Sequence, residues 1–238
     1  AYRAMVRAKV ESLRLAQLDT LDPGLVMALE GYMKLAERYT QSRRPNLLIA
    51  HGLSGSGKTY VSQRLLEQTP LIRLRSDVER KRLFGLSPLD PSSSAPGAGI
   101  YSSAASERTY GRLEAIAAQL MADGWTVLVD ATFLERETRD RFRRLAESCD
   151  VPFAIMHCEA DLSVQRQRVA DRKDDASEAK LDILERQLVN EQPLEADEKA
   201  VTLSIDTTGA PDLDGLLRFL EADAARATTD TDPTSQGN

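Results

Sequence analysis

Residues 47–59 read Leu-Leu-Ile-Ala-His-Gly-Leu-Ser-Gly-Ser-Gly-Lys-Thr, and this stretch decides the fold. The apolar run at 47–51 predicts a short buried strand, and a helix is predicted at 58–66. Between them, residues 52–59 fit the pattern G-x-x-x-x-G-K-[ST]. Glycines let such a loop wrap so that successive backbone N–H groups point inward at phosphate oxygens. The sequence therefore predicts a loop that binds the phosphates of a nucleotide.

Each residue of this loop has a predicted role. Lys58 reaches the β- and γ-phosphates, and the Thr59 hydroxyl ligates Mg²⁺. The positive end of the following helix adds favourable potential for an anion. A dinucleotide fingerprint does not fit, because Tyr60 stands where G-x-G-x-x-G needs its last small residue. The rest of the phosphate cradle is Gly52, Leu53, Ser54, Gly55, Ser56 and Gly57.

Short apolar strands and helices alternate after the loop. Further strands are predicted at 71–74, 126–129, 153–157 and 201–205, and residues 161–190 are predicted to form one long helical passage. Alternating strands and helices imply right-handed crossovers. We therefore expect an α/β fold, a P-loop NTPase of the kinase type with a parallel five-stranded sheet and helices on both faces.

The chain is predicted to divide into three parts. Residues 1–42 have helical periodicity, and Asp22 and Pro23 are suited to the N-cap and first turn of a second helix. Two such short helices must dock elsewhere on the chain or on a further domain. Residues 43–221 form the phosphate-binding domain, with a mobile loop predicted at 90–99. Residues 222–238 lack apolar residues to bury, and a disordered tail is expected there.

Composition excludes several classes of protein. The chain has 238 residues and a formal net charge of −6, which argues against holding nucleic acid by bulk charge. No apolar run approaches the roughly 20 residues of a membrane span. Two cysteines, Cys149 and Cys158, are too few for a disulfide framework and are expected to be reduced thiols in a cytoplasmic protein.

The segment after the second strand supplies a candidate base. Asp77 follows the strand at the edge of the sheet where the phosphate loop lies, so its carboxylate can accept a proton from an acceptor hydroxyl. Arg80, one turn later on the same helix face, can bind an anionic part of the acceptor. The alternative is that Asp77 only caps a helix over residues 78–84.

Three further features concern the metal and the transferred phosphate. Asp130 ends an apolar strand and is predicted to hold Mg²⁺ with Thr59, although strands also end in Asp for solubility. Arg168 and Arg172 lie at i, i+4 and can close over the phosphates, or else form a solvated face. In the arginine-rich helix at 135–146, Arg139 is predicted to turn toward the cleft and bind substrate.

These motifs together resemble a known family. The resemblance is carried by the loop at 52–59, R-S-D-V-E-R at 75–80, G-I-Y-S at 99–102, V-D-A-T-F-L at 129–134 and D-A-S-E-A at 175–179. They are similar to small P-loop kinases related to zeta toxins and polynucleotide 5′-kinases. They are especially similar to the ATP-binding half of bifunctional aminoglycoside phosphotransferase/ATP-binding proteins, and residues 1–10 resemble the last helices of the preceding phosphotransferase-like lobe.

The resemblance implies ATP with Mg²⁺, Asp77 as base, Arg168 and Arg172 as lid arginines, and Tyr101 beside the acceptor. The predicted function is ATP-dependent phosphoryl transfer to a hydroxyl of a small-molecule or nucleotide-like acceptor. A polynucleotide 5′-kinase is one alternative. Another is an ATP-binding regulatory module that hydrolyses slowly and reports to a phosphotransferase lobe. The sequence names neither the acceptor nor the choice between ATP and GTP.

Overall fold

The computed structural model describes residues 2–18, 20–38, 44–92, 98–171 and 181–226. Arg172, part of the loop predicted at 90–99, the motif at 175–179 and residues 227–238 lie outside the described part. The chain divides into two compact units, Ala1–Arg43 and Arg44–Asn238. This division falls next to the boundary expected after residue 42.

The first unit consists of two helices that pack against each other, α1 (Tyr2–Leu15) and α2 (Pro23–Arg38). As predicted, Asp22 caps the second helix: its Oδ1 accepts a hydrogen bond from the backbone N–H of Gly24 at 2.7 Å. Pro23, which has no N–H to leave unpaired, is the first helical residue.

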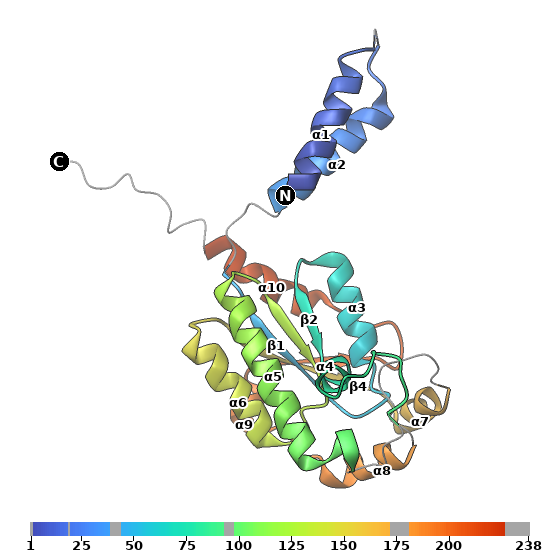
Figure 1. The fold of residues 1–238 in the computed structure, drawn as a ribbon, viewed down its shortest axis with the longest axis vertical. Coiled ribbons are helices and arrows are strands. Elements are labelled where there is room, and N and C mark those ends of the chain that lie inside the picture. Colours follow the sequence, from blue (N-terminus) through green and yellow to red (C-terminus); the bar gives the residue numbers. More distant parts are fainter. Residues whose placement is uncertain (1, 19, 39–43, 93–97, 172–180, 227–238) are drawn as a thin grey trace, which may run out of the picture. The chain divides into compact units, whose positions relative to one another are not determined.

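The second unit contains a parallel sheet of five strands in the order β2-β3-β1-β4-β5 (Figure 1). All five strands lie within one or two residues of their predicted positions. The strands are β1 (Leu47–His51), β2 (Ile72–Arg75), β3 (Val127–Asp130), β4 (Phe153–Glu159) and β5 (Thr202–Asp206). The helices are α3 (Lys58–Gln68), α4 (Ser76–Leu83), α5 (Ser103–Ala122), α6 (Arg136–Ser148), α7 (Leu162–Ala170), α8 (Leu181–Asn190), α9 (Ala196–Lys199) and α10 (Asp214–Arg226), with a short 3₁₀ turn at Gly99–Tyr101.

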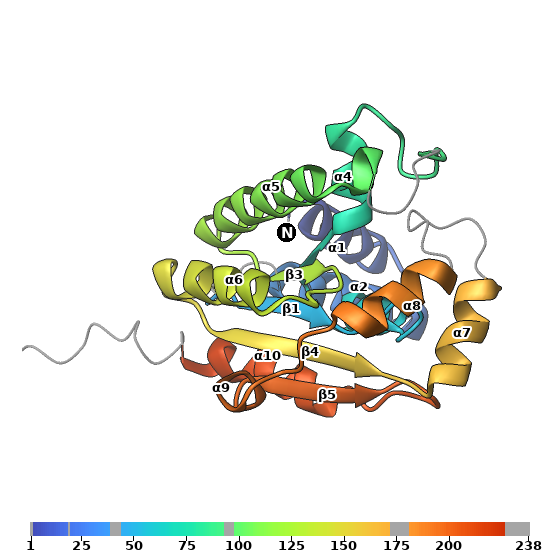
Figure 2. The same ribbon diagram turned by 90° about the horizontal axis from the view of Figure 1, so that it is seen from below.

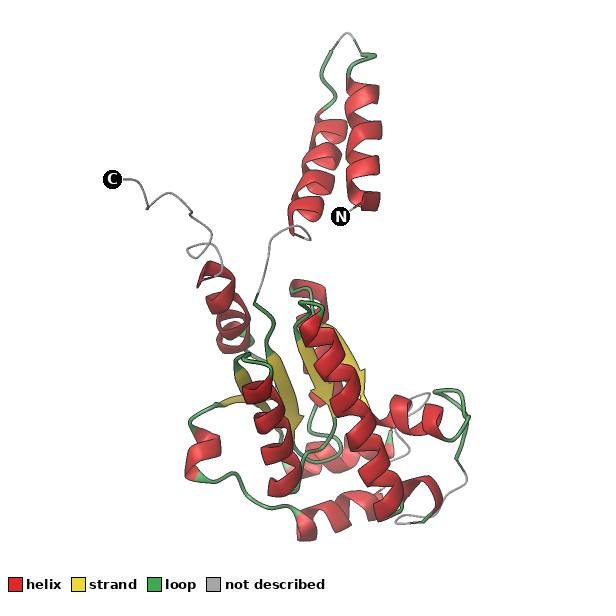
Figure 3. Cartoon of the chain, turned by 60° about the vertical axis from the view of Figure 1, so that its left-hand side comes forward, coloured by secondary structure: helices red, strands yellow, loops and turns green. Residues whose placement is uncertain are grey.

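Helices cover both faces of the sheet because its central strands are apolar on both sides. Leu47 and Ile49 face α5 and α6, which lie side by side on one face (Figure 2). Leu48 and Ala50 face α3 and α10 on the other. Figure 3 shows the resulting layers, with the strands enclosed between helices. The predicted fold class is confirmed.

Two predicted boundaries need correction. The passage at 161–190 is not one continuous helix in the described residues, because α7 ends at Ala170 and α8 begins at Leu181. The last helix, α10, continues to Arg226, past the start predicted for the tail. Both cysteines are free thiols. In the part of the chain that the structure describes, no helix is long and apolar enough to cross a bilayer.

The strand order places a ligand site at one end of the sheet. β1 is central, and the chain proceeds from it to β2 and β3 on one side and to β4 and β5 on the other. In open α/β sheets such a reversal leaves a crevice outside the carboxyl ends of the strands. The glycine-rich loop leaves β1 at this end.

Candidate active site

The loop between β1 and α3 has the backbone conformation that its glycines permit. Gly52 has φ of 134° and Gly57 has φ of 88°, values that L side chains rarely adopt. A Cβ on Gly52 would lie 2.4 Å from the carbonyl oxygen of Cys158, so the adjacent backbone also excludes a side chain. Gly57 is the N-cap of α3 and provides no side-chain cap. The first N–H groups of α3 therefore lack a side-chain cap and can bind an anion.

Lys58 and Thr59 lie where the motif predicts. The Lys58 Nζ donates hydrogen bonds to the carbonyl oxygens of Gly52 and Leu53, each at 2.7 Å. The Thr59 hydroxyl donates to Oδ2 of Asp130 at 3.2 Å. Burial raises the pKa of Asp130, and the charge of Lys58 partly offsets this.

Thr59 and Asp130 fit the demands of Mg²⁺. The ion binds oxygen ligands at about 2.0–2.1 Å in an octahedron, so neighbouring ligand oxygens lie about 3 Å apart. The Thr59 and Asp130 oxygens have nearly that separation. Among the described residues, no group of three or more His, Cys, Asp and Glu side chains could hold a metal ion. Mg²⁺ is commonly held by one or two protein oxygens together with water and phosphate.

Asp77 and Arg80 of α4 line the same cavity as Lys58, Thr59 and Asp130. Asp77 is not a helix cap: α4 begins at Ser76, its N-cap is Arg75, and no side chain caps it. The capping alternative is therefore wrong, because the helix begins before Asp77 and contains it. The half-buried carboxylate in the first turn has the positive end of the helix beside it.

The Arg80 side chain is buried, but only some of its hydrogen-bond donors have partners among the described residues. Its Nη1 donates to the carbonyl oxygen of Ile100 at 3.0 Å and to the Ser106 hydroxyl at 3.2 Å. Its guanidinium lies over the Tyr101 ring, 5.3 Å from the centroid, and Tyr101 also lines the cavity. The buried Nε of Arg80 has no hydrogen-bond partner among the described residues. One charged donor of Arg80 is thus left without a hydrogen bond in the described structure.

Arg168 contacts the phosphate loop without lining the cavity. Its Nη1 donates to the carbonyl oxygen of Gly55 at 3.3 Å and to the Thr207 hydroxyl at 3.0 Å, and its Nη2 donates to the Thr207 carbonyl oxygen at 2.6 Å. The predicted partner, Arg172, lies outside the described residues. Arg168 is thus bound to the loop itself rather than fully solvated.

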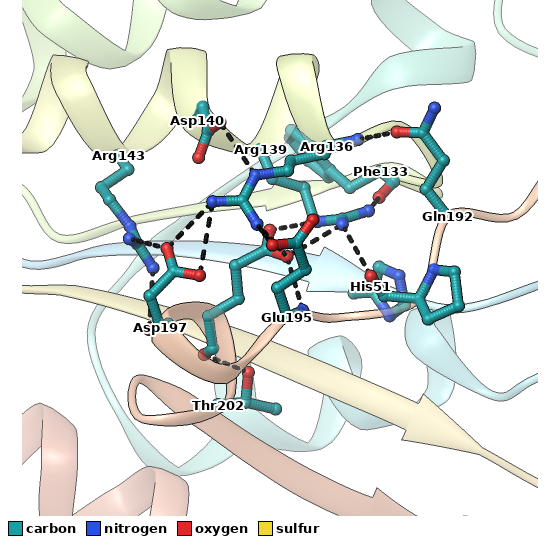
Figure 4. Close-up of polar contacts among 12 residues, drawn as sticks. His51, Phe133, Arg136, Arg139, Asp140, Arg143, Gln192, Glu195, Asp197 and Thr202 are labelled. Carbon is teal, nitrogen blue, oxygen red and sulfur yellow. Dashed lines mark hydrogen bonds and ion pairs between the residues drawn. The ribbon is translucent and has the colours of Figure 1, made fainter.

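Arg139 does not line the cavity, contrary to the prediction. It is 1% exposed, and its Nε and Nη2 bind the two carboxylate oxygens of Glu198 at 2.5 and 3.0 Å. Its Nη1 donates to the carbonyl oxygens of Phe133 and Leu134. Every nitrogen of the guanidinium is used inside the protein. Two other arginines of α6, Arg136 and Arg143, bind Asp197 nearer the surface (Figure 4).

Sequence reasoning missed several residues that line the cavity, Tyr110 of α5 and Gln187 of α8 among them. The Oε1 of Gln187 accepts a hydrogen bond from the backbone N–H of Ser54 at 2.8 Å. Nothing in the spacing of α8 singles out this glutamine. Its partner lies in the phosphate loop, far away in sequence, so only the folded structure reveals the contact.

The strand–loop–helix unit, the Thr59–Asp130 pair and the parallel sheet define the class: a P-loop NTPase fold of the kinase type. The family model AAA_33, described as an AAA domain, matches residues 47–194. The match covers more than half of the chain, and the chain belongs to this family.

Solved structures agree with this fold, and curated relatives share part of the sequence. An uncharacterized protein of Mycobacterium tuberculosis is 27% identical over 183 residues, which are 77% of this chain and 36% of the relative. The chain thus spans about a third of the length of the curated relatives it matches. A sugar kinase from Janibacter sp. HTCC2649 superposes with a TM-score of 0.57 at 19% identity, covering 77% of this chain and 98% of that chain. A candidate kinase from Chloroflexus aurantiacus has a TM-score of 0.58 at 20% identity, with 78% and 98% covered.

Proposed function

We propose that this chain transfers the terminal phosphoryl group of ATP to a hydroxyl group of a small-molecule or nucleotide-like acceptor, with Mg²⁺ as cofactor. One observation carries the proposal: Lys58 and Thr59 line the same cavity as Asp77 and Arg80. Nucleotide binding alone needs the first pair. The second pair adds a base and a cation from another helix, which are the groups an acceptor hydroxyl requires.

The nucleotide side of the site rests on the loop. Lys58 exchanges the carbonyl oxygens of Gly52 and Leu53 for phosphate oxygens, which are stronger acceptors because they are charged. Thr59 and Asp130 would hold Mg²⁺, which neutralises charge on the phosphates when bound. Arg168, already bound to the outside of the loop, adds positive potential there.

On the acceptor side, Asp77 takes the hydroxyl proton as the acceptor oxygen forms a bond to the γ-phosphorus. The bond from that phosphorus to the bridging oxygen breaks at the same time, and ADP leaves with the electron pair. The unpaired Nε of Arg80 binds an anionic group elsewhere on the acceptor. Tyr101 holds the guanidinium plane from one side. The acceptor class we expect is therefore a hydroxyl compound with a carboxylate, sulfate or phosphate.

A second candidate function is an ATP-binding or ATPase module that regulates a phosphotransferase lobe. The observation favouring it is that the curated relatives are about three times as long as the matched region. The resemblance to bifunctional aminoglycoside phosphotransferase/ATP-binding proteins supports the same arrangement. A polynucleotide 5′-kinase, suggested by the resemblance to that family, is disfavoured by the net charge of −6.

The test begins with a library of anionic hydroxyl compounds, each scored by ADP release with Mg·ATP. On the acceptor it identifies, Asp77→Asn should lower phosphoryl transfer by roughly 10²–10⁴-fold, because the variant keeps the shape of the side chain and loses the base. A drop near the lower end fits a loose transition state, which needs little help from a base. ATP affinity should not change, because the loop and Mg²⁺ hold the phosphates.

Lys58→Ala is the matched variant on the nucleotide side and should weaken ATP binding without unfolding the protein. ATP binding with no acceptor-dependent turnover, together with an unaltered slow hydrolysis in Asp77→Asn, would contradict the kinase proposal and favour the regulatory module.

A further inference from the structure

Gln187 reaches from α8 into the phosphate loop. Its Oε1 accepts the backbone N–H of Ser54 at 2.8 Å, and the side chain also lines the cavity. Among the described residues, the Nε2 of the same amide donates no hydrogen bond. The Oε1 of Gln187 therefore accepts one backbone N–H of the loop, and its Nε2 is a hydrogen-bond donor on the same side chain.

The backbone under Gln187 is held against the loop by apolar packing. Leu184, one turn earlier on α8, is fully buried against Leu53 of the loop and Val169 of α7. Leu53 is the neighbour of Ser54, so the packing contact and the hydrogen bond join the same two segments. The position of Gln187 relative to the Ser54 N–H is thus fixed by the packing of Leu184 as well as by the hydrogen bond.

The Ser54 end of the loop faces the acceptor residues. Of the loop preceding Lys58, Ser54 and Gly55 line the cavity shared with Asp77 and Arg80. The group being transferred must lie between the nucleotide and the acceptor hydroxyl. Ser54 therefore lies beside the part of the cavity in which the terminal phosphate would meet the acceptor hydroxyl.

We propose that Gln187 contacts the terminal phosphate and makes the site distinguish a nucleoside triphosphate from a diphosphate. One N–H cannot donate well to both Gln187 and a phosphate oxygen. When a triphosphate binds, its terminal phosphate takes the Ser54 N–H, and the Gln187 amide turns to donate from Nε2 to the same phosphate. A diphosphate has no such group, so the bond between Ser54 and Gln187 stays. This inference rests on the proposed function.

The test compares the affinities of the full chain for Mg·ATP and Mg·ADP, measured by titration calorimetry. Gln187→Leu removes both polar atoms and should weaken ATP roughly tenfold or more, the usual effect of losing a hydrogen bond to a charged group. ADP affinity should stay at the wild-type value. Gln187→Glu keeps the acceptor for Ser54 and replaces the donor with a negative charge, so it should weaken ATP further and again spare ADP.

Val189→Ala is the control on the same helix, because Val189 is 84% exposed and lies outside the cavity. It should change neither affinity. Equal losses of ATP and ADP in the Gln187 variants would mean that the residue only holds α8 in place, and no loss of either would mean no contact. Each result would overturn this inference while leaving the proposed function standing. A wild-type chain that binds neither nucleotide would overturn both.

Discussion

Two buried arginines, Arg80 in α4 and Arg139 in α6, differ in whether a carboxylate of the described residues balances the charge of the guanidinium. Arg139 is matched by the carboxylate of Glu198, and its remaining donors bind backbone carbonyl oxygens. Arg80 meets a carbonyl, a hydroxyl and an aromatic ring, but no carboxylate among the described residues. Burying a charge without a counter-ion costs free energy that a stable fold avoids elsewhere. Under the proposed function, the anionic group of the acceptor would supply the counter-ion of Arg80.

The ion pairs around Arg139 also hold a short segment of the chain against α6. Glu198 lies on α9 and accepts the backbone N–H of Glu195 while binding Arg139. Arg136 adds a bridge to Glu195 from the same face of α6. The segment between α8 and β5 is thereby fastened to α6 by charge, because it has few apolar side chains with which to pack.

The largest effect is expected for Arg139→Ala. Removing one partner of a buried pair leaves Glu198 without its main counter-ion, and we expect a loss of about 3–5 kcal/mol in the free energy of unfolding, measured by urea titration. Arg141→Ala is the matched control, because Arg141 binds Glu107 and Glu114 nearer the surface. It should lose at most about 1 kcal/mol. Equal losses in the two variants would contradict the structural role given to Arg139.

A smaller and different effect is expected for Arg80→Met. The variant removes a buried charge without a counter-ion, so the free energy of unfolding should stay constant or rise. The KM for an anionic acceptor should increase roughly tenfold to a hundredfold, with the affinity for ATP unchanged. Arg144→Met, at an exposed position of α6 outside the cavity, serves as control. Loss of stability without a change in KM would remove the distinction between the two arginines.

A further effect concerns pH and His51, which lies next to the Arg139 network. Burial, with contributions from the charges of His157 and Arg139, lowers the pKa of His51 from 6.5 to about 3. Between pH 6.5 and about pH 3, His51 is protonated in the unfolded chain and neutral in the folded chain. Its contribution to the free energy of unfolding is therefore complete above pH 6.5 and decreases as the pH falls. One proton gives a slope of about 1.4 kcal/mol per pH unit.

His51→Asn should flatten that slope in urea titrations carried out across the same pH interval. Its stability above pH 6.5 supplies the reference, since there the wild-type histidine is neutral in both states. An unchanged slope in the variant would show that other groups control the acid sensitivity.

The sequence was sufficient for the features that depend on neighbouring residues. The strands are local apolar runs, and the loop at 52–59 carries its own glycines, lysine and threonine, so both could be predicted from short windows. Asp77, Arg80 and Asp130 also lie in the cavity, because Asp130 ends a strand and the other two closely follow a strand that ends at the same edge of the sheet.

The contacts that sequence reasoning missed join distant segments. Arg139 was expected in the cleft because nothing in α6 reveals that Glu198 lies opposite it. Gln187 was missed because its partner, Ser54, lies 133 residues away in the sequence. Such pairs are set by how helices pack on the sheet, and periodicity within one helix does not encode the neighbour it meets.

The small cluster of Leu53, Val169 and Leu184 has a consequence for local stability. It is separate from the two larger clusters on the faces of the sheet. Segments held by few buried apolar side chains open at a lower free energy than the core they adjoin. The amides of α7 and α8 should therefore exchange with solvent deuterium well before those of β1, although all three meet at one loop. The two helices packed on the glycine-rich loop should thus open locally while the sheet stays folded.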